Sequence, residues 1–204
     1  MAIFPPLSGF DYLIVIIISI IFMIGIYQFY LWTGKHFFYT PRNLSTKFDH
    51  WFPYRPVWGW VYICLYPVIA VSVFTASNMR QFMYALFSYF ILIMILLIFY
   101  LFFPVKVPPE WHRYRAGNTL SEKMMRILRK FDAPTNCFPS AHVASATLTA
   151  FHVMANVPVW GYWPFLFPLL ISLSVLYTKQ HYFADIFPAA LLGWFTFFFY
   201  THIY

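Results

Sequence analysis

Residues 83–103 have the sequence MYALFSYFILIMILLIFYLFF, an apolar stretch without a charged residue. A helix needs about 20 such residues to cross the hydrocarbon of a bilayer, so this stretch predicts a transmembrane helix. Residues 12–32, YLIVIIISIIFMIGIYQFYLW, are equally free of charge. No basic segment precedes them and no small-residue cleavage site follows, so we expect a retained anchor rather than a signal peptide.

The composition of the whole chain agrees with these two stretches. Of 204 residues, 62% are hydrophobic and 9% are charged, against about 45–50% and about 25% in soluble domains. Aromatic residues make up 25% of the chain, which is typical of proteins that meet lipid interfaces. This composition excludes an ordinary soluble globule and a disordered chain. Two cysteines, Cys64 and Cys137, are too few for a disulfide scaffold or a cysteine-based metal site.

We therefore expect an all-α fold, a six-transmembrane-helix bundle that forms one integral membrane domain over residues 1–204. Four further stretches are apolar enough to serve as spans. The six predicted spans are roughly 12–32, 57–76, 83–103, 140–158, 163–180 and 184–203.

Basic residues are concentrated on one side of the predicted bundle. With six spans, the connections 33–56 and 104–139 and the turn at Lys179 share a side and carry 12 of the 13 Lys and Arg residues, whereas Arg80 stands alone opposite. The positive-inside rule then places the basic side in the cytoplasm. Basic residues kept for ligand binding distort that rule, so the side of the membrane stays open.

Within the long connection, SEKMMRILRKF (121–131) has apolar residues at helical spacing with basic residues between them. One interpretation is an interfacial amphipathic helix, between spans three and four, that lies on anionic headgroups. The alternative is a helix that packs on its own bundle.

Three polar clusters lie at the ends of spans on the basic side. In the first, KVPPEWHR (106–113), two prolines stiffen the segment and hold the cations Lys106 and Arg113 in a fixed relation. Cations so close to a membrane often bind lipid headgroups and nothing else, which is the alternative for this cluster taken alone.

The second cluster, FPSAH (138–142), has the Pro and Ser of a helix start. The free N–H groups and the dipole of a helix N-terminus attract anions. Ser140 and His142 would add a hydrogen-bond donor and a proton source. The alternative is a capped helix with an interfacial histidine.

The third cluster, HYFAD (181–185), places His181 and Asp185 on one face of a helix. A carboxylate bonded to one ring nitrogen fixes the tautomer and makes the other nitrogen a better nucleophile. A structural pair of Asp185 with Lys179 is the alternative. Taken together, the three clusters suit phosphoryl transfer: cations hold anionic oxygens, one histidine attacks phosphorus and the other protonates the leaving oxygen.

In order and spacing, the clusters resemble the motifs K-x6-R-P, P-S-G-H and S-R-x5-H-x3-D of the type 2 phosphatidic acid phosphatase superfamily of six-span membrane enzymes. The resemblance covers residues 106–185. The matching positions are Lys106 and Arg113, then Pro139, Ser140, Ala141 and His142, then Ser174, Val175, His181 and Asp185.

Carried over to this chain, the resemblance implies that His181 is a nucleophile that forms a phosphohistidine and is oriented by Asp185. It implies that His142 protonates the leaving alcohol. The resemblance implies no metal and no other cofactor. The residues that would hold the phosphate are Lys106, Arg113, Ser140 and the backbone N–H near Ala141.

The chain departs from the family pattern at three positions. Tyr114 replaces a proline, Ala141 replaces a glycine, and Val175 replaces an arginine that holds phosphate in the family. Lys179 and Arg115 are the candidates that could supply the missing cation.

We therefore expect a metal-independent lipid phosphatase that acts on a phosphate ester of the phosphatidic acid, phosphatidylglycerol phosphate or polyprenyl diphosphate type. The patterns F-P-S-x-H and Y-T-K-x-H-Y-x-x-D also resemble the inositol-phosphorylceramide synthase branch. The alternative function is thus a lipid phosphotransferase that moves a phosphoryl headgroup to a lipid or sugar-lipid acceptor. A transporter or lipid-binding scaffold on a degenerate phosphatase bundle is a third, non-catalytic alternative.

The expected partners are a lipid phosphate substrate and the bilayer, and nucleic acid is not among them. We expect a multi-pass protein of the cell inner membrane. The loop charges favour a cytoplasmic site, whereas bacterial members of the family resemble outward-facing enzymes. The side of the active site and the oligomeric state therefore stay open.

Overall fold

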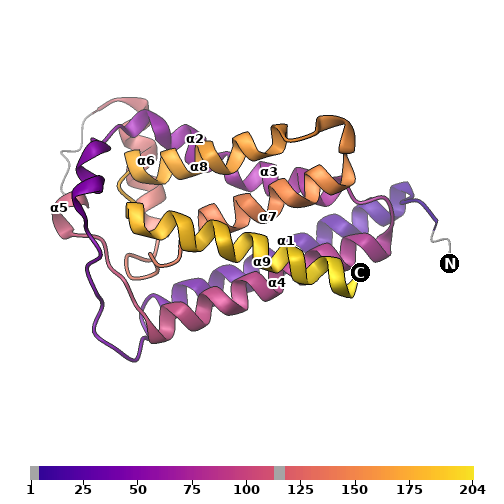
Figure 1. Ribbon diagram of the computed structural model, residues 1–204, viewed down its shortest axis with the longest axis horizontal. Coiled ribbons are helices and arrows are strands. Elements are labelled where there is room, and N and C mark those ends of the chain that lie inside the picture. Colours follow the sequence, from indigo (N-terminus) through magenta and orange to yellow (C-terminus); the bar gives the residue numbers. More distant parts are fainter. Residues whose placement is uncertain (1–4, 113–117) are drawn as a thin grey trace.

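The computed structural model describes residues 5–112 and 118–204, which form helices joined by irregular segments, with no strand among them. Figure 1 shows the longer helices running side by side along the long axis. The α-helices are α1 (Gly9–Thr33), α2 (Gly59–Ile63), α3 (Leu65–Phe74), α4 (Met79–Phe102), α5 (Pro109–His112), α6 (Leu120–Phe131), α7 (Ala141–Asn156), α8 (Leu166–Tyr177) and α9 (Ile186–Ile203). Short 3-10 turns are η1 (Lys47–Trp51), η2 (Pro56–Trp58), η3 (Pro158–Trp160), η4 (Trp163–Phe165) and η5 (Phe183–Asp185).

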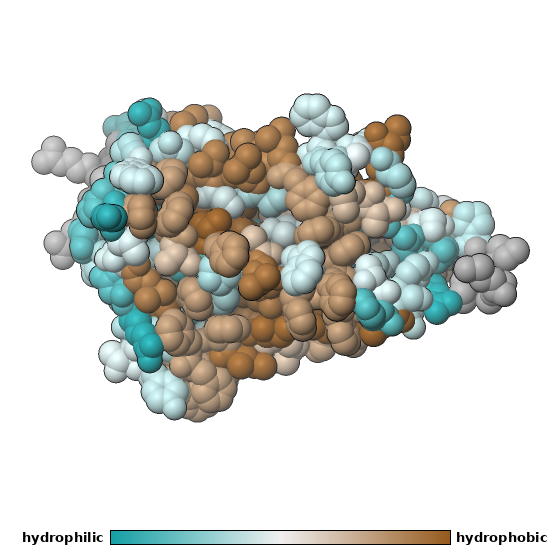
Figure 2. Space-filling model, in the orientation of Figure 1, coloured by the Kyte–Doolittle hydropathy of each residue, from teal (hydrophilic) through white to brown (hydrophobic). Residues whose placement is uncertain are grey.

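Three of the described helices are long and apolar enough to cross a membrane, namely Gly9–Thr33, Met79–Phe102 and Phe183–Ile203. Shorter apolar helices cover Pro56–Ala70 and Trp163–Tyr177. Figure 2 shows an apolar band across the middle of the molecule and hydrophilic residues gathered towards its two ends. The all-α class is thus confirmed for the described residues, while the count of six spans stays a prediction.

The predicted span 57–76 is interrupted in the structure, because α2 ends at Ile63 and α3 begins at Leu65. Pro67 has no backbone N–H and cannot donate to the carbonyl of Ile63 one turn earlier, so the helix breaks there. The predicted span 140–158 becomes α7, which begins after the Ser140 cap and ends before Pro158.

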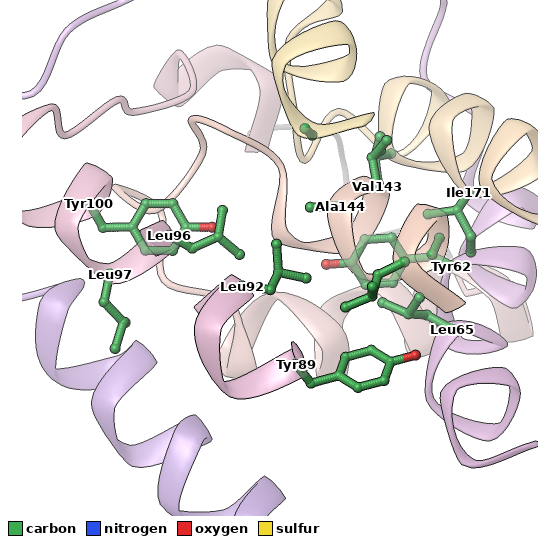
Figure 3. Close-up of a cluster of buried hydrophobic side chains, with 14 of the residues drawn as sticks. Tyr62, Leu65, Tyr89, Leu92, Leu96, Leu97, Tyr100, Val143, Ala144 and Ile171 are labelled. Atoms are coloured by element: carbon green, nitrogen blue, oxygen red, sulfur yellow. The ribbon is translucent and has the colours of Figure 1, made fainter. Parts of the chain in front are cut away.

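Helix α7 lies at the centre of the bundle and packs against α3, α4, α8 and α9. Figure 3 shows the buried side chains that meet around it, among them Tyr62, Leu92 and Val143. The closest approach is at Gly193 of α9, where a Cβ atom would lie 2.5 Å from the carbonyl oxygen of Ala144. Only glycine lets the backbones of α7 and α9 come this near.

A layer of short elements closes one end of the bundle, at the left of Figure 1 and away from both termini. Its helix α6 buries Met124 and Met125 against Gly59, where a Cβ atom would lie 2.5 Å from the Met125 sulfur. Residue Val105 forms isolated bridges to both Arg42 and Asn136, which binds three distant segments together beneath this layer. The predicted helix 121–131 is therefore present and packs on the bundle; its position in a membrane interface stays a prediction.

Candidate active site

His181 is held by two hydrogen-bond acceptors at the polar end of the bundle. Its Nδ1 atom lies 2.8 Å from the carbonyl oxygen of Cys137 and 3.3 Å from Oδ2 of Asp185. Because a carbonyl oxygen only accepts, Nδ1 carries the ring proton and the lone pair is on Nε2. The same Asp185 oxygen accepts the backbone N–H of Tyr182 at 2.9 Å, which fixes the carboxylate.

The chain reaches His181 through a tight turn at the end of α8. Lys179 has φ 59°, in the left-handed region, and the backbone N–H groups of Lys179 and Gln180 return to the carbonyls of Leu176 and Val175. This pair of bonds is a Schellman motif, which normally has glycine at the left-handed position. The turn points Gln180 and His181 back towards the end of the bundle, where both are buried.

His142 lies in the first turn of α7 and next to His181. The two imidazole rings meet edge to face, with centroids 5.7 Å apart. Ser140 is the N-cap of α7, and its Oγ accepts the backbone N–H of Val143 at 3.4 Å. The hydroxyl of Tyr100 in α4 donates to the Pro139 carbonyl at 3.1 Å, so this helix start is also fastened to α4.

Tyr62 connects His142 to a carboxylate that the motifs did not indicate. Its ring lies 4.3 Å from the His142 ring, and its hydroxyl donates to both carboxylate oxygens of Asp132, each at 3.1 Å. Burial raises the pKa of the Asp132 carboxyl to about 6, although the Tyr62 hydrogen bond and the charges of His181 and Arg129 act in the opposite direction.

Two cavities meet at these residues. The larger, about 520 Å³, lies between α1, α3 and α4, is lined almost entirely by apolar side chains, and reaches His142 and Asp132 at its polar end. The smaller, about 120 Å³, is polar and is lined by Asp132 and His181 among others. Tyr30 and Asp132 line both cavities, so the two cavities adjoin. A molecule with an apolar tail and a small polar head could place the tail in the larger cavity and the head in the smaller one.

The structure brings together five of the predicted residues: His181 and Asp185 in the segment that leads into and ends η5, and Ser140, Ala141 and His142 at the start of α7. Lys106 is exposed at the same end of the bundle, and its carbonyl accepts the Tyr182 hydroxyl at 2.6 Å. Arg113 and Arg115 lie outside the described residues.

Lys179 lines neither cavity, and its side chain is bound elsewhere. Its ammonium donates to the Asp49 carbonyl at 2.7 Å and lies 4.6 Å from the centre of the Trp111 ring. Burial lowers the pKa of this ammonium, and the charge of Asp49 acts in the opposite direction. A phosphate contact of Lys179 stays a prediction.

The three sequence motifs do not include the polar residues that α6 and the segment after it supply to the small cavity. These are Arg129, Asp132 and Asn136. The amphipathic pattern of 121–131 was the available signal, but it does not say which polar residue faces inward. In the described part of the chain, no three metal-ligating side chains come together.

These features define a helical membrane protein with a paired-histidine site between an apolar and a polar cavity. A family model described as the PAP2 superfamily matches residues 43–199, which include every motif position named above. The chain therefore belongs to this superfamily, the type 2 phosphatidic acid phosphatase superfamily, whose members are phosphatase- and phosphotransferase-type lipid enzymes. No curated protein and no solved structure matches the chain significantly.

Proposed function

We propose that this protein is a membrane lipid phosphatase that hydrolyses a phosphate ester of a lipid through a phosphohistidine intermediate. The observation that carries the proposal is the His142–His181 pair, with ring centroids 5.7 Å apart and the Nδ1 side of His181 tied to acceptors. One tetrahedral group can contact both rings at this spacing, which is what an attacking and a proton-donating histidine require.

In the first step, the lone pair on Nε2 of His181 attacks phosphorus. The N–P bond forms, the P–O bond to the lipid alcohol breaks, and His142 in its protonated form gives its proton to the leaving oxygen. Asp185 and the Cys137 carbonyl hold the Nδ1 proton and stabilise the positive charge that develops on the His181 ring.

In the second step, a water molecule replaces the alcohol. The neutral His142 takes a proton from this water, its oxygen attacks phosphorus, and the N–P bond breaks with its electron pair returning to Nε2. Inorganic phosphate leaves and both histidines regain their starting states. No metal takes part in this scheme, and we propose that cations and N–H groups carry the phosphate charge.

The phosphate ligands in this proposal are Lys106, Arg113, Ser140 and the N–H near Ala141, with Lys179 as a further candidate. The lipid chain would occupy the cavity of about 520 Å³ between α1, α3 and α4. Its apolar lining supports a substrate of the phosphatidic acid, phosphatidylglycerol phosphate or polyprenyl diphosphate type, because such a lining binds hydrocarbon and not sugar or nucleotide.

The test is phosphate release by the purified protein from a panel of lipid phosphates in detergent, with chelator present, beside the His181→Ala variant. Metal-independent release that disappears in the variant supports the proposal. Release that persists in His181→Ala, with the variant folded as judged by gel filtration, contradicts the nucleophile assignment.

One observation favours the alternative of a lipid phosphotransferase. The apolar cavity extends between α1, α3 and α4 as far as His142, so a lipid alcohol could approach the proposed phosphohistidine through a space that excludes water. A phosphotransferase would release little phosphate from a lipid monoester but would exchange labelled headgroups between lipids. Headgroup exchange without phosphate release would contradict the assignment as a hydrolase and support the assignment as a phosphotransferase.

We also propose that the six spans cross the cell inner membrane as α1, η2–α3, α4, α7, η4–α8 and α9, with α6 in the interface at the polar end. Each of the six predicted spans overlaps one or more helical segments, which supports this assignment. A single cysteine at the exposed position Lys130, after Cys64 and Cys137 are replaced, tests the side of the polar end. Labelling by an impermeant thiol reagent in whole cells places it outside, and labelling only after lysis places it in the cytoplasm.

A further inference from the structure

The small polar cavity beside His181 contains hydrogen-bond donors without acceptors. Among the described residues, Nε and Nη2 of Arg129 and Nε2 of Gln180 are buried and have no hydrogen-bond partner. Gln180 is only 6% exposed, so water does not readily compensate for the missing bonds. Buried polar groups are nearly always paired, and an unpaired donor costs free energy unless a ligand supplies the acceptor.

The charge in this cavity has no carboxylate in direct contact among the described residues, although Asp132 is near enough for the charge of Arg129 to act on its pKa. The Arg129 guanidinium lies 5.2 Å from the centre of the Tyr54 ring, and no carboxylate of the described residues lies within ion-pair distance of it. Asp132 lines the same cavity, but Tyr62 donates to both of its oxygens. A partly buried, unpaired guanidinium is favourable where an anion binds.

The unpaired atoms of Arg129 have the geometry of a phosphate site. Nε and Nη2 form one edge of the planar guanidinium, and such an edge binds two oxygens of one phosphate in parallel hydrogen bonds. The cavity of about 120 Å³ has room for a group of this size. His181 lines the same cavity, so an anion held there lies beside the proposed nucleophile.

We infer that Arg129 and Gln180 bind the phosphoryl oxygens of the substrate and supply the cation that this chain lacks at Val175. Val175 is fully buried in the apolar core, and its side chain has no polar atom. The inference rests on the proposed function for its substrate, a phosphate ester. It assigns the phosphate contact to α6, an element outside the three motifs.

A further residue of this cavity, Asn136, has a buried acceptor without a hydrogen-bond partner. Asn136 donates through Nδ2 to the Tyr30 carbonyl at 2.7 Å and to Thr33 Oγ1 at 3.0 Å, so its amide orientation is fixed and Oδ1 is left without a partner. An acceptor beside two donors fits a protonated phosphate oxygen or the attacking water, each of which brings its own hydrogen.

The experiment measures binding of inorganic phosphate to the purified full chain, as protection against thermal unfolding, for wild type, Arg129→Gln, Arg129→Lys and Gln180→Leu. The matched control is Lys130→Gln, which removes an exposed cation next to Arg129 on the same helix. We expect the apparent Kd to rise about 10- to 100-fold in Arg129→Gln, because a hydrogen bond to a charged group is lost. Arg129→Lys should recover part of the loss, and Lys130→Gln should bind as wild type does.

Saturable binding with unchanged affinity in both Arg129→Gln and Gln180→Leu would overturn the inference, as would the absence of phosphate binding in wild type. If Arg129→Gln does not fold, the Gln180→Leu and Arg129→Lys variants test the inference instead. We expect the Kd for phosphate to rise in either variant. The proposed function can be contradicted independently of this inference. If the wild type binds phosphate through Arg129 but forms no phosphohistidine and releases no phosphate, the anion site stands and the enzymatic activity is contradicted.

Discussion

The rings of His142 and His181 meet edge to face, with their planes at 62° and their centroids 5.7 Å apart, although the two residues come from different ends of different helices. Helix α7 presents His142 in its first turn, and the Schellman turn after α8 returns His181 to the same place. In the proposed mechanism, each histidine approaches the phosphate from its own direction, so that one can attack and the other can donate a proton.

Replacement of His142 by alanine should slow the reaction most for substrates with poor leaving groups. An alkyl phosphate needs a proton on its leaving oxygen, whereas an aryl phosphate departs as a stabilised phenolate. Because general acid catalysis contributes about 10²–10⁴-fold, we expect a loss of this size for a lipid phosphate and a much smaller loss for p-nitrophenyl phosphate. The measurement is kcat for both substrates in wild type and His142→Ala.

The exposed histidine at the far end of α9 supplies the control for this comparison. His202→Ala should leave both rates unchanged. Equal losses for the two substrates in His142→Ala would contradict the acid assignment and indicate a role in binding or folding.

Asp185→Asn should reduce turnover without abolishing it. The Cys137 carbonyl still accepts the Nδ1 proton of His181 at 2.8 Å, so the ring keeps its tautomer when the carboxylate is lost. We therefore expect a smaller effect than the fall of about 10⁴-fold that follows the same change in a Ser-His-Asp triad. Single-turnover formation of the acid-labile phosphohistidine measures the effect on the first step; a loss as complete as in His181→Ala would show that the carbonyl does not hold the ring.

Part of this site could be predicted from the sequence, and the reason is its locality. His181 and Asp185 stand four residues apart in one motif, and Ser140 and His142 share one helix start, so the spacing in the chain already implies contact. The apolar runs likewise predict the all-α class, because a long uncharged stretch has few other stable forms in lipid.

The α6 side of the site could not be predicted, because its geometry depends on tertiary packing. Four basic residues of 121–131 have similar sequence surroundings, and only the burial of Met124 and Met125 against Gly59 determines that Arg129 lines the cavity. In the same way, the contact between Tyr62 and Asp132 joins residues that lie 70 positions apart, and no motif spans that distance.

The titration of Asp132 predicts a pH-dependent effect on stability. Its pKa rises from 3.8 to about 6 in the folded protein, so the folded state holds this proton more tightly than the unfolded state does. The stability that this group contributes is complete below about pH 4 and is lost as the pH rises to about 6. Asp132→Asn keeps an acceptor for the Tyr62 hydroxyl and removes the titration.

The measurement is the Tm of wild type and of Asp132→Asn in detergent between pH 4 and pH 8. The difference, variant minus wild type, should rise between about pH 4 and pH 6 and then stay constant. A difference that is the same at every pH would show that Asp132 titrates in the fold as it does in the unfolded chain. Glu110→Gln, at an exposed position outside α6, controls for a general effect of removing one carboxylate.

The cavity between α1, α3 and α4 predicts selective effects of bulky substitutions on long-chain substrates. Ser19 lines this cavity, whereas Ile17 on the same helix is 48% exposed and does not. Ser19→Phe should fill the space that the lipid chain occupies and raise KM for a long-chain lipid phosphate by about tenfold, while kcat/KM for p-nitrophenyl phosphate stays unchanged. Ile17→Phe adds a ring on the exposed side of α1 and should change neither value. An equal loss for both substrates in Ser19→Phe would mean that the ring disturbs the bundle, and no loss for either would place the lipid chain elsewhere.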